Sequence, residues 1–301
     1  VVIKVIDQGN GTVVITVPGE DGNVTVKIGN ETFNATVVNG TAVVTLNNIT
    51  PGEHEIEVIY SGDENHKGTS TNSTVNVPKY DTPISIEVAN STVGNVTTVI
   101  VNVPKDVKDN VTVAIDGKTY SAKPVDGKAV FEIVGLIAGN KTVTAIYAGD
   151  DWFVANSTVA HFKVDKVASS VNVTGDVINV DENATIIITG PNDYNGTAVV
   201  NVDGKNYTVS ITNGAGKLEV AGLANGTYAV KVTLLENDKY LGSENDTAKV
   251  LVNKVESFVT VNVDNITVGD VAVVNITVPA DATGNVTVEI DGVGTYTVPV
   301  A

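Results

Sequence analysis

The chain has 301 residues, which at the usual domain size predicts about two or three domains. Its 35 acidic residues outnumber 18 lysines, there is no arginine, and the net charge of -17 disfavours binding to nucleic acid or to an anionic membrane surface. The absence of cysteine excludes disulfides, thiolate metal sites and thiol nucleophiles. No apolar run approaches the roughly 20 residues that span a bilayer, so we expect no membrane insertion in this segment.

The first residues already alternate as a strand does. Val1 begins inside this pattern, and no signal-peptide pattern precedes it. We therefore expect that a targeting segment either was removed by processing or lies outside this sequence.

A strand-like pattern of six residues recurs along the chain with a single period. Its copies begin at Asn23, Asn110, Thr197 and Asn285, and two further sets of residues keep the same spacing: Gly52, Gly139 and Gly226, and Lys79, Lys166 and Lys254. The steps are 87 or 88 residues, and several anchors that share one period identify an internal repeat. Junctions at the lysines predict units at residues 1–79, 80–166, 167–254 and 255–301. We expect the second and third to be complete, the first N-terminally incomplete and the fourth C-terminally truncated.

Within each unit, apolar and polar residues alternate over short stretches. Val24, Val26 and Ile28 alternate with Thr25 and Lys27, which is typical of a strand with one buried face, and Val111, Val113 and Ile115 keep the same spacing. Turn signals separate such stretches, at Asn39-Gly40, Asp116-Gly117, Asp126-Gly127, Asp203-Gly204, Asn213-Gly214 and Asp291-Gly292. The sequence therefore predicts an all-β chain of tandem immunoglobulin-like Greek-key β-sandwich domains, with about seven strands each, that form an elongated rod.

A late strand of the first two units ends in the same four-residue motif. It is Tyr60-Ser-Gly-Asp63, followed by His66, and Tyr147-Ala-Gly-Asp150, followed by Phe153. This motif resembles the bacterial immunoglobulin-like repeats of large surface adhesins. The Asn- and Thr-rich, arginine-free style is similar to the adhesin-like proteins of methanogenic archaea in particular.

The third unit departs from this motif. Leu234 replaces the tyrosine and Glu236-Asn237-Asp238 replaces Gly-Asp, although Tyr240 keeps the aromatic. The resemblance covers the whole chain and implies the fold more specifically than the ligand. It implies an extracellular protein of the cell surface or cell wall with a structural or adhesive role.

Sequons for N-glycosylation are frequent. The sequence holds 21 Asn-x-Ser/Thr matches, and the last residue is Thr in every one. Asn and Thr are abundant, so composition alone accounts for a good part of these matches. The exclusive use of Thr nevertheless favours real acceptors. The candidates are Asn23, Asn34, Asn95, Asn110, Asn156, Asn206, Asn225, Asn275 and Asn285.

No constellation of residues points to catalysis. The three histidines, His54, His66 and His161, do not have metal-ligand spacing. His66 occupies the repeat position of Phe153 and Tyr240, which predicts packing over the end of the sandwich. A glycan hydrolase would need two carboxylates in one cleft, and near-identical repeats offer no unique cleft. We therefore predict that the chain is not an enzyme and has no catalytic, cofactor or metal site.

Two features leave binding open. The acidic pairs Asp63-Glu64 and Asp150-Asp151 could hold Ca²⁺, although a solvated acidic loop accounts for them better. Trp152 is the only tryptophan, and its repeat equivalents are Asn65 and Lys239, so the fold does not require it. An exposed Trp152 could contact a sugar or a partner, whereas partial packing at a domain junction explains it equally well.

Two non-enzymatic functions fit these observations. The chain could be the repeat stalk of a cell-surface adhesin-like protein, which projects binding modules from the cell wall and meets other surface proteins or glycans. Alternatively it could be a subunit of an extracellular filament, sheath or surface layer, in which strand edges pair between copies of the chain.

Overall fold

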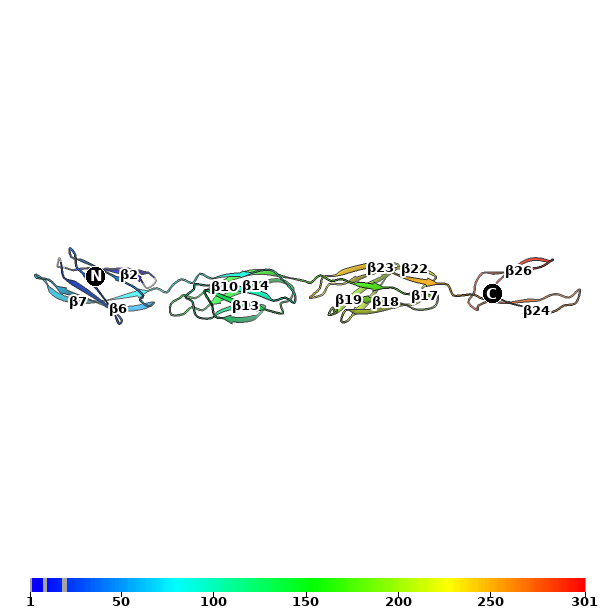
Figure 1. Cartoon of the computed structure of the whole chain (residues 1–301), viewed down its shortest axis with the longest axis horizontal. Helices are drawn as coiled ribbons and strands as arrows, with labels where there is room; N and C mark the ends of the chain where they lie inside the picture. The colour runs from blue at the N-terminus through cyan, green and yellow to red at the C-terminus, as the bar shows by residue number, and fades with distance from the viewer. Residues whose placement is uncertain (1, 8–9, 18–20, 301) are drawn as a thin grey trace. The chain divides into compact units, whose positions relative to one another are not determined.

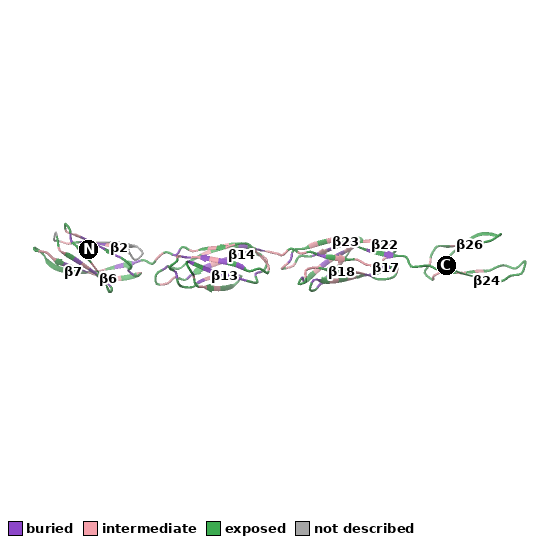
Figure 2. Ribbon diagram, in the orientation of Figure 1, coloured by how far each residue is buried: buried purple, intermediate pink, exposed green. Residues whose placement is uncertain are grey.

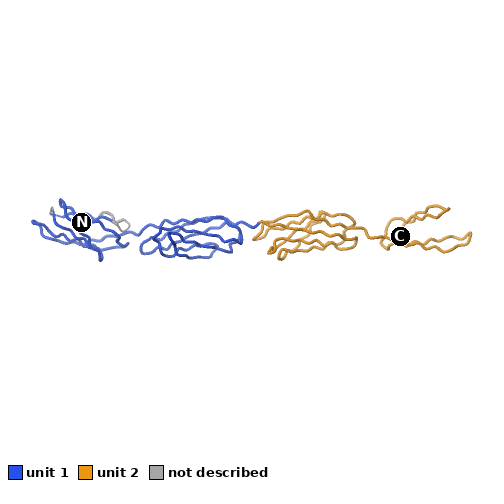
Figure 3. Tube along the Cα trace, in the orientation of Figure 1, with its two compact units in different colours: residues 1–167 blue, residues 168–301 orange. Residues whose placement is uncertain are grey.

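The computed structural model describes residues 2–7, 10–17 and 21–300, so Val1 lies outside the described residues. All regular structure in this part of the chain is β-strand, and the prediction of an all-β, tandem immunoglobulin-like sandwich fold is confirmed. None of the described residues belongs to a helix long and apolar enough to cross a membrane. The chain divides into two compact units, Val1–Val167 and Ala168–Ala301 (Figure 3). We number the four sequence repeats 1 to 4, and every sheet takes its strands from one repeat.

Repeat 1 packs two antiparallel sheets face to face. The smaller sheet has the order β1 (Val2–Asp7), β2 (Asn10–Thr16) and β5 (Thr41–Leu46). The larger has the order β4 (Glu31–Thr36), β3 (Asn23–Ile28), β6 (Gly52–Gly62) and β7 (Lys67–Val77). Buried residues between the sheets, among them Val24, Val44 and Ile56, form one hydrophobic cluster.

Repeat 2 has eight strands in two sheets, and its chain runs from cyan to green in Figure 1. One sheet has the order β13 (Lys128–Ile133), β10 (Thr97–Asn102) and β8 (Ser85–Val88). The other has the order β12 (Lys118–Ala122), β11 (Val111–Ile115), β14 (Gly139–Tyr147), β15 (Asn156–Asp165) and β9 (Ser91–Thr92). The chain changes sheet between β10 and β11 and again between β12 and β13, which is the crossover expected of a Greek key.

Repeat 3, in the second compact unit, repeats this plan strand for strand. Its smaller sheet has the order β16 (Asn172–Thr174), β18 (Ala184–Thr189) and β21 (Ala215–Val220). Its larger sheet has the order β17 (Val177–Asn179), β23 (Ser243–Asn253), β22 (Gly226–Leu234), β19 (Gly196–Val202) and β20 (Lys205–Ile211). Repeats 2 and 3 each have one strand more than expected, because the first strand splits and its second half, β9 or β17, pairs in parallel with the last strand.

Repeat 4 contains two separate hairpins. They pair β24 (Thr260–Val263) with β25 (Val274–Thr277) and β26 (Asn285–Ile290) with β27 (Gly294–Pro299). None of residues 253–300 is buried (Figure 2).

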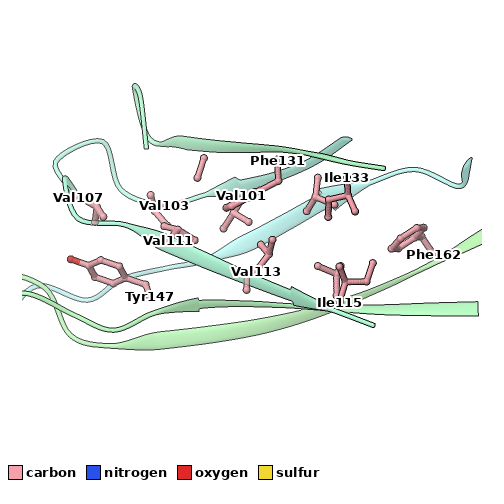
Figure 4. Close-up of a cluster of buried hydrophobic side chains, with 14 of the residues drawn as sticks. Val101, Val103, Val107, Val111, Val113, Ile115, Phe131, Ile133, Tyr147 and Phe162 are labelled. Atoms are coloured by element: carbon pink, nitrogen blue, oxygen red, sulfur yellow. The ribbon is translucent and has the colours of Figure 1, made fainter. Parts of the chain in front are cut away.

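The core of repeat 2 follows directly from the alternation of its sequence. Along β11, Val111, Val113 and Ile115 are buried while the residues between them are only partly covered. They join one cluster of buried side chains between the two sheets, with Tyr147 at one end and Phe162 at the other (Figure 4). Full burial of each Val or Ile is worth about 1.5–3 kcal/mol, so a sandwich of this size can be stable without disulfides.

Five of the six turn signals also have the expected geometry, whereas at Asp291-Gly292 only the glycine has a positive φ. Asp116 and Gly117, between β11 and β12, have φ of 48° and 74°. Positive φ at both central residues defines a tight hairpin turn whose twist matches the strands, and Asp-Gly and Asn-Gly tolerate it best. Asn39-Gly40, Asp126-Gly127, Asp203-Gly204 and Asn213-Gly214 show the same pair of positive φ angles.

Candidate functional site

The acid of the Tyr-x-Gly-Asp motif closes the loop between the last two strands. In repeat 2, Asp150 Oδ1 accepts hydrogen bonds from the backbone amides of Trp152 at 2.7 Å and Phe153 at 2.6 Å. Asp63 Oδ1 accepts two loop amides in the same way in repeat 1. In repeat 3, Asn237 Oδ1 replaces the carboxylate at 2.9 and 2.7 Å from two loop amides. The motif acid is therefore a loop cap, and a carboxamide can perform the same task.

The electrostatics of this loop keep its acid charged. Burial disfavours the charged form of Asp150, but the neighbouring Tyr147 hydroxyl, the amides of Phe153 and Trp152 and the Lys79 ammonium outweigh it, and the pKa of Asp150 lies below its ordinary value. Burial, followed by the Asp150 carboxylate, raises the pKa of Tyr147 above its ordinary value. Asp150 is therefore ionised and Tyr147 neutral near pH 7.

The glycine of the motif is required by the backbone. Gly149 has φ of 83°, and a Cβ placed on it would lie 2.8 Å from the backbone nitrogen of Ala155. Any larger residue would strain this tight turn and push the loop away from β15. The motif glycine and acid therefore shape the loop that carries Trp152.

Trp152 packs on a second aromatic from the segment that precedes β8. The Tyr80 amide donates to the Trp152 carbonyl at 2.7 Å, and the Val154 amide donates to the Tyr80 carbonyl at 3.0 Å. The rings of Tyr80 and Trp152 are stacked with centroids 6.4 Å apart, and Phe153 lies 5.5 Å from Tyr80 on the same measure. Trp152 keeps 39% of its surface exposed. Trp152 therefore packs beside the junction segment and also presents a face to solvent, and its contact with a sugar or a partner stays a prediction.

The exposed face of Trp152 lines a cavity of about 880 Å³. Tyr80, Trp152 and Phe153 supply aromatic walls together with two prolines, and the charged lining groups are those of Asp81, Asp106, Asp150 and Lys108. Three carboxylates against one ammonium make this cavity acidic. All of these residues belong to repeat 2.

Around this cavity the lysine ammonium groups have hydrogen-bond partners, whereas two of the carboxylates have none within the residues that the structure describes. Lys108 Nζ donates to the backbone carbonyl of Lys105 at 2.8 Å, and Lys79 Nζ donates to the Asp150 carbonyl at 2.5 Å. Within residues 21–300, the carboxylates of Asp81 and Asp106 have no ion-pair or hydrogen-bond partner. The cavity therefore offers two carboxylates that are available to a ligand.

In each acidic pair considered for Ca²⁺, the first aspartate binds backbone amides of its own loop. Asp63 and Asp150 each use one oxygen for two loop amides. In the described part of the chain, no group of three or more His, Asp or Glu side chains is placed to hold a metal ion. Ca²⁺ binding and the absence of enzymatic activity both stay predictions.

The histidines occupy three unrelated places. His54 bonds the Thr50 carbonyl at 2.6 Å, and His161 lies 3.1 Å from the hydroxyl of Thr142. The expectation that His66 packs over the sandwich end is wrong. Its side chain is 42% exposed, and Nδ1 lies 2.9 Å from Asp63, because an imidazole gains more from the adjacent carboxylate than from an apolar contact.

All nine candidate glycosylation sites are exposed, but their side-chain nitrogens differ. Asn156 Nδ2 donates to the Thr82 carbonyl at 2.7 Å, and Asn225 Nδ2 donates to the Val252 carbonyl at the same distance. Nδ2 is the atom that would carry a glycan. A glycan at either position must fit around an existing hydrogen bond, whereas Asn95 and Asn110 have no such bond among the described residues.

We expect native protein to be heavier than the bare chain of 31.2 kDa. Peptide mapping should find higher glycan occupancy at Asn95 and Asn110 than at Asn156 and Asn225, because of the two Nδ2 hydrogen bonds. Intact-mass measurement of material from the natural source is the primary test. A mass equal to that of the bare chain would rule out glycosylation.

Comparisons with known proteins bear on the fold. A family model described as bacterial Ig-like domain (group 3) matches residues 6–78. A structure from a 1.5-MDa bacterial ice-binding adhesin is 21% identical, covers 82% of this chain and 92% of its own, and has a TM-score of 0.32. An I-band fragment of titin is 15% identical, covers 83% of this chain and 94% of its own, and has a TM-score of 0.33. The fibronectin(III)-like modules of Clostridium thermocellum CbhA are 16% identical, cover 57% of this chain and 95% of their own, and have a TM-score of 0.26.

No curated protein matches the chain significantly. The three solved structures have TM-scores below 0.5. The narrower resemblance to methanogen adhesin-like proteins stays a prediction. The first repeat is therefore similar to bacterial Ig-like domains, and repeats 1 to 3 are immunoglobulin-like β-sandwiches.

Proposed function

We propose that this chain is part of the stalk of an extracellular protein of the cell surface or cell wall, with a structural role in adhesion. The observation that carries the proposal is the serial reuse of one sandwich. Repeats 1 and 2 each bury their own set of apolar residues, and repeat 3 repeats the strand plan of repeat 2. A chain of self-sufficient domains lengthens by simple addition, which suits a spacer.

Short junctions support a stiff spacer. The stretches between the last strand of one repeat and the first strand of the next are residues 78–84, 166–171 and 254–259. The first of them is held to the loop of repeat 2 through Lys79 and the two backbone hydrogen bonds of Tyr80. A connection of this length that is fixed by hydrogen bonds, as residues 78–84 are, limits bending more than a flexible linker would.

The outward faces of the strands support an exposed location. Along β7 the residues from Lys67 to Asn72 are all exposed, and they are Lys, Gly, Thr, Ser and Asn. Together with the net charge of -17, such faces keep a crowded surface molecule soluble. The similarity of repeat 1 to bacterial Ig-like domains is in keeping with this assignment.

The isolated chain is expected to be a monomeric rod. A compact protein of 301 residues has a radius of gyration of about 19 Å. An 11-residue strand such as β7 spans about 36 Å, so four repeats end to end reach about 140 Å, and a rod of that length has a radius of gyration of about 40 Å. Small-angle scattering combined with sedimentation measures both shape and mass. A value near 19 Å would contradict the stalk, and a concentration-dependent ladder of polymers would support the filament instead.

A further inference from the structure

The loop between β10 and β11 in repeat 2 contains the same turn as its counterpart in repeat 3. The Val107 amide donates to the Pro104 carbonyl at 3.1 Å, and 87 residues later the Tyr194 amide donates to the Pro191 carbonyl at 2.8 Å. An aspartate precedes the donor in both turns, Asp106 in repeat 2 and the equivalent Asp193 in repeat 3. Because the two turns match, the two aspartates occupy equivalent backbone positions in their sandwiches.

In repeat 3 this place holds an ammonium group. Lys239 Nζ lies 2.5 Å from Asp193 Oδ2 and 5.1 Å from the centroid of the Tyr240 ring. The Tyr240 hydroxyl donates to Asp193 Oδ1 at 2.5 Å. A carboxylate and an aromatic face therefore bind a cation supplied by the chain itself.

In repeat 2 the carboxylate and the aromatic remain, but the cation is missing. Trp152 replaces Lys239 and Phe153 replaces Tyr240, so Asp106 has neither an ammonium nor a phenol as partner. Lys108, the one lysine among the residues that line this space, donates to the Lys105 carbonyl instead. The space becomes the cavity of about 880 Å³, with a second carboxylate from Asp81 and further aromatic surface from Tyr80.

We propose that this cavity binds an organic ammonium group, of the kind carried by a lysine side chain or an amino sugar. The ammonium occupies the position that Lys239 Nζ takes in repeat 3, paired with Asp106 and Asp81, and its alkyl or ring carbons lie against Trp152 and Tyr80. An anion is repelled by the carboxylates. A neutral ligand would leave both carboxylates without a counter-charge, so the charge of the ligand is the determinant of binding. The site lies within one repeat and does not depend on the stalk function.

Trp152 makes binding directly measurable, because it is the only tryptophan of the chain and lines the cavity. The probe is Nα-acetyl-lysine methylamide, and its matched control is the Nε-acetylated form, which has nearly the same shape without the charge. We expect the charged probe to change Trp152 fluorescence at concentrations of about 1 mM, and the neutral control to bind at least about tenfold more weakly. Glucosamine and N-acetylglucosamine form a second pair that separates an amino-sugar source from a peptide source. Equal binding of charged and neutral partners in both pairs would overturn the proposal.

Two variants test the geometry by saturation-transfer NMR, which does not need tryptophan. Asp106→Asn should weaken binding of the charged probe about tenfold or more. Trp152→Lys should abolish it, because the new side chain places its own ammonium against Asp106 as Lys239 does in repeat 3. Asp151→Asn, one residue from the cavity, is the charge-matched control and should bind as the original does. Retained binding in Asp106→Asn, with unchanged circular dichroism, would contradict the assignment.

Discussion

Replacing Ile133 with alanine should unfold repeat 2 at a clearly lower denaturant concentration while repeat 3 keeps its own transition. Ile133 lies on β13, is 0% exposed and belongs to a cluster made only of residues of repeat 2. Removing three carbons from such a site leaves a cavity and costs about 2–5 kcal/mol. Trp152 fluorescence follows repeat 2 alone, and circular dichroism follows all repeats together.

The matched control lies on the same strand. Val130 points to the outer face of β13 and is 51% exposed, so Val130→Ala should change the stability of repeat 2 by no more than about 0.5 kcal/mol. Hydrogen exchange read by mass spectrometry would assign each transition to its repeat. If Ile133→Ala also lowered the protection of β18 and β22 in repeat 3, the repeats would not fold independently.

The elements that the sequence predicted well depend on neighbours along the chain. Val111, Val113 and Ile115 reveal β11 because a strand with one buried face alternates with a period of two. Asp116-Gly117 reveals the turn because only a few residue pairs tolerate positive φ. Since these signals recur every 87 or 88 residues, the repeat and its fold class followed from sequence.

The elements that were missed depend on residues that meet only in space. β9 and β17 have two and three residues, too few to show a period, and they exist because the chain changes sheet to pair with the last strand. The sequence also did not reveal that the buried tyrosine lies on a strand in repeat 2 but in a loop in repeat 3. Tyr147 and Val107 lie at the same end of the core in repeat 2 (Figure 4), whereas in repeat 3 Leu234 is on the strand and Tyr194 fills the loop.

The sequence predicted only one residue of the candidate site. Trp152 stood out as the sole tryptophan, with Lys239 as its repeat equivalent. Its partners Tyr80 and Asp106 come from distant stretches, and nothing in their local sequence links them to it. A comparison of repeats 2 and 3 could have found the cavity. The aspartate is the same in both repeats, Asp106 and Asp193, whereas Lys239 of repeat 3 is replaced by Trp152 in repeat 2.

The second large effect is expected at the loop cap. Asp150→Ala removes the acceptor of two backbone amides, at 2.7 and 2.6 Å, and should destabilise repeat 2 by about 1–2 kcal/mol near pH 7. Asp150→Asn should retain most of the stability, because Asn237 caps the equivalent loop in repeat 3. Unfolding followed through Trp152 measures both variants, and Asp151→Ala is the control for loss of a loop carboxylate.

The pH dependence of the stability of repeat 2 distinguishes the contribution of the Asp150 charge from that of its hydrogen-bond geometry. Its pKa is lowered in the folded state, so its stabilising contribution is complete above the unfolded pKa of about 3.9 and is lost as the pH falls through the folded pKa. The stability advantage of the original chain over Asp150→Ala should therefore shrink between pH 5 and pH 2, to an extent set by how far the folded pKa lies below about 3.9. The advantage of Asp150→Asn over Asp150→Ala should stay constant, because the carboxamide does not titrate. If all three chains lost stability in parallel with acid, Asp150 would cap the loop without its charge contributing.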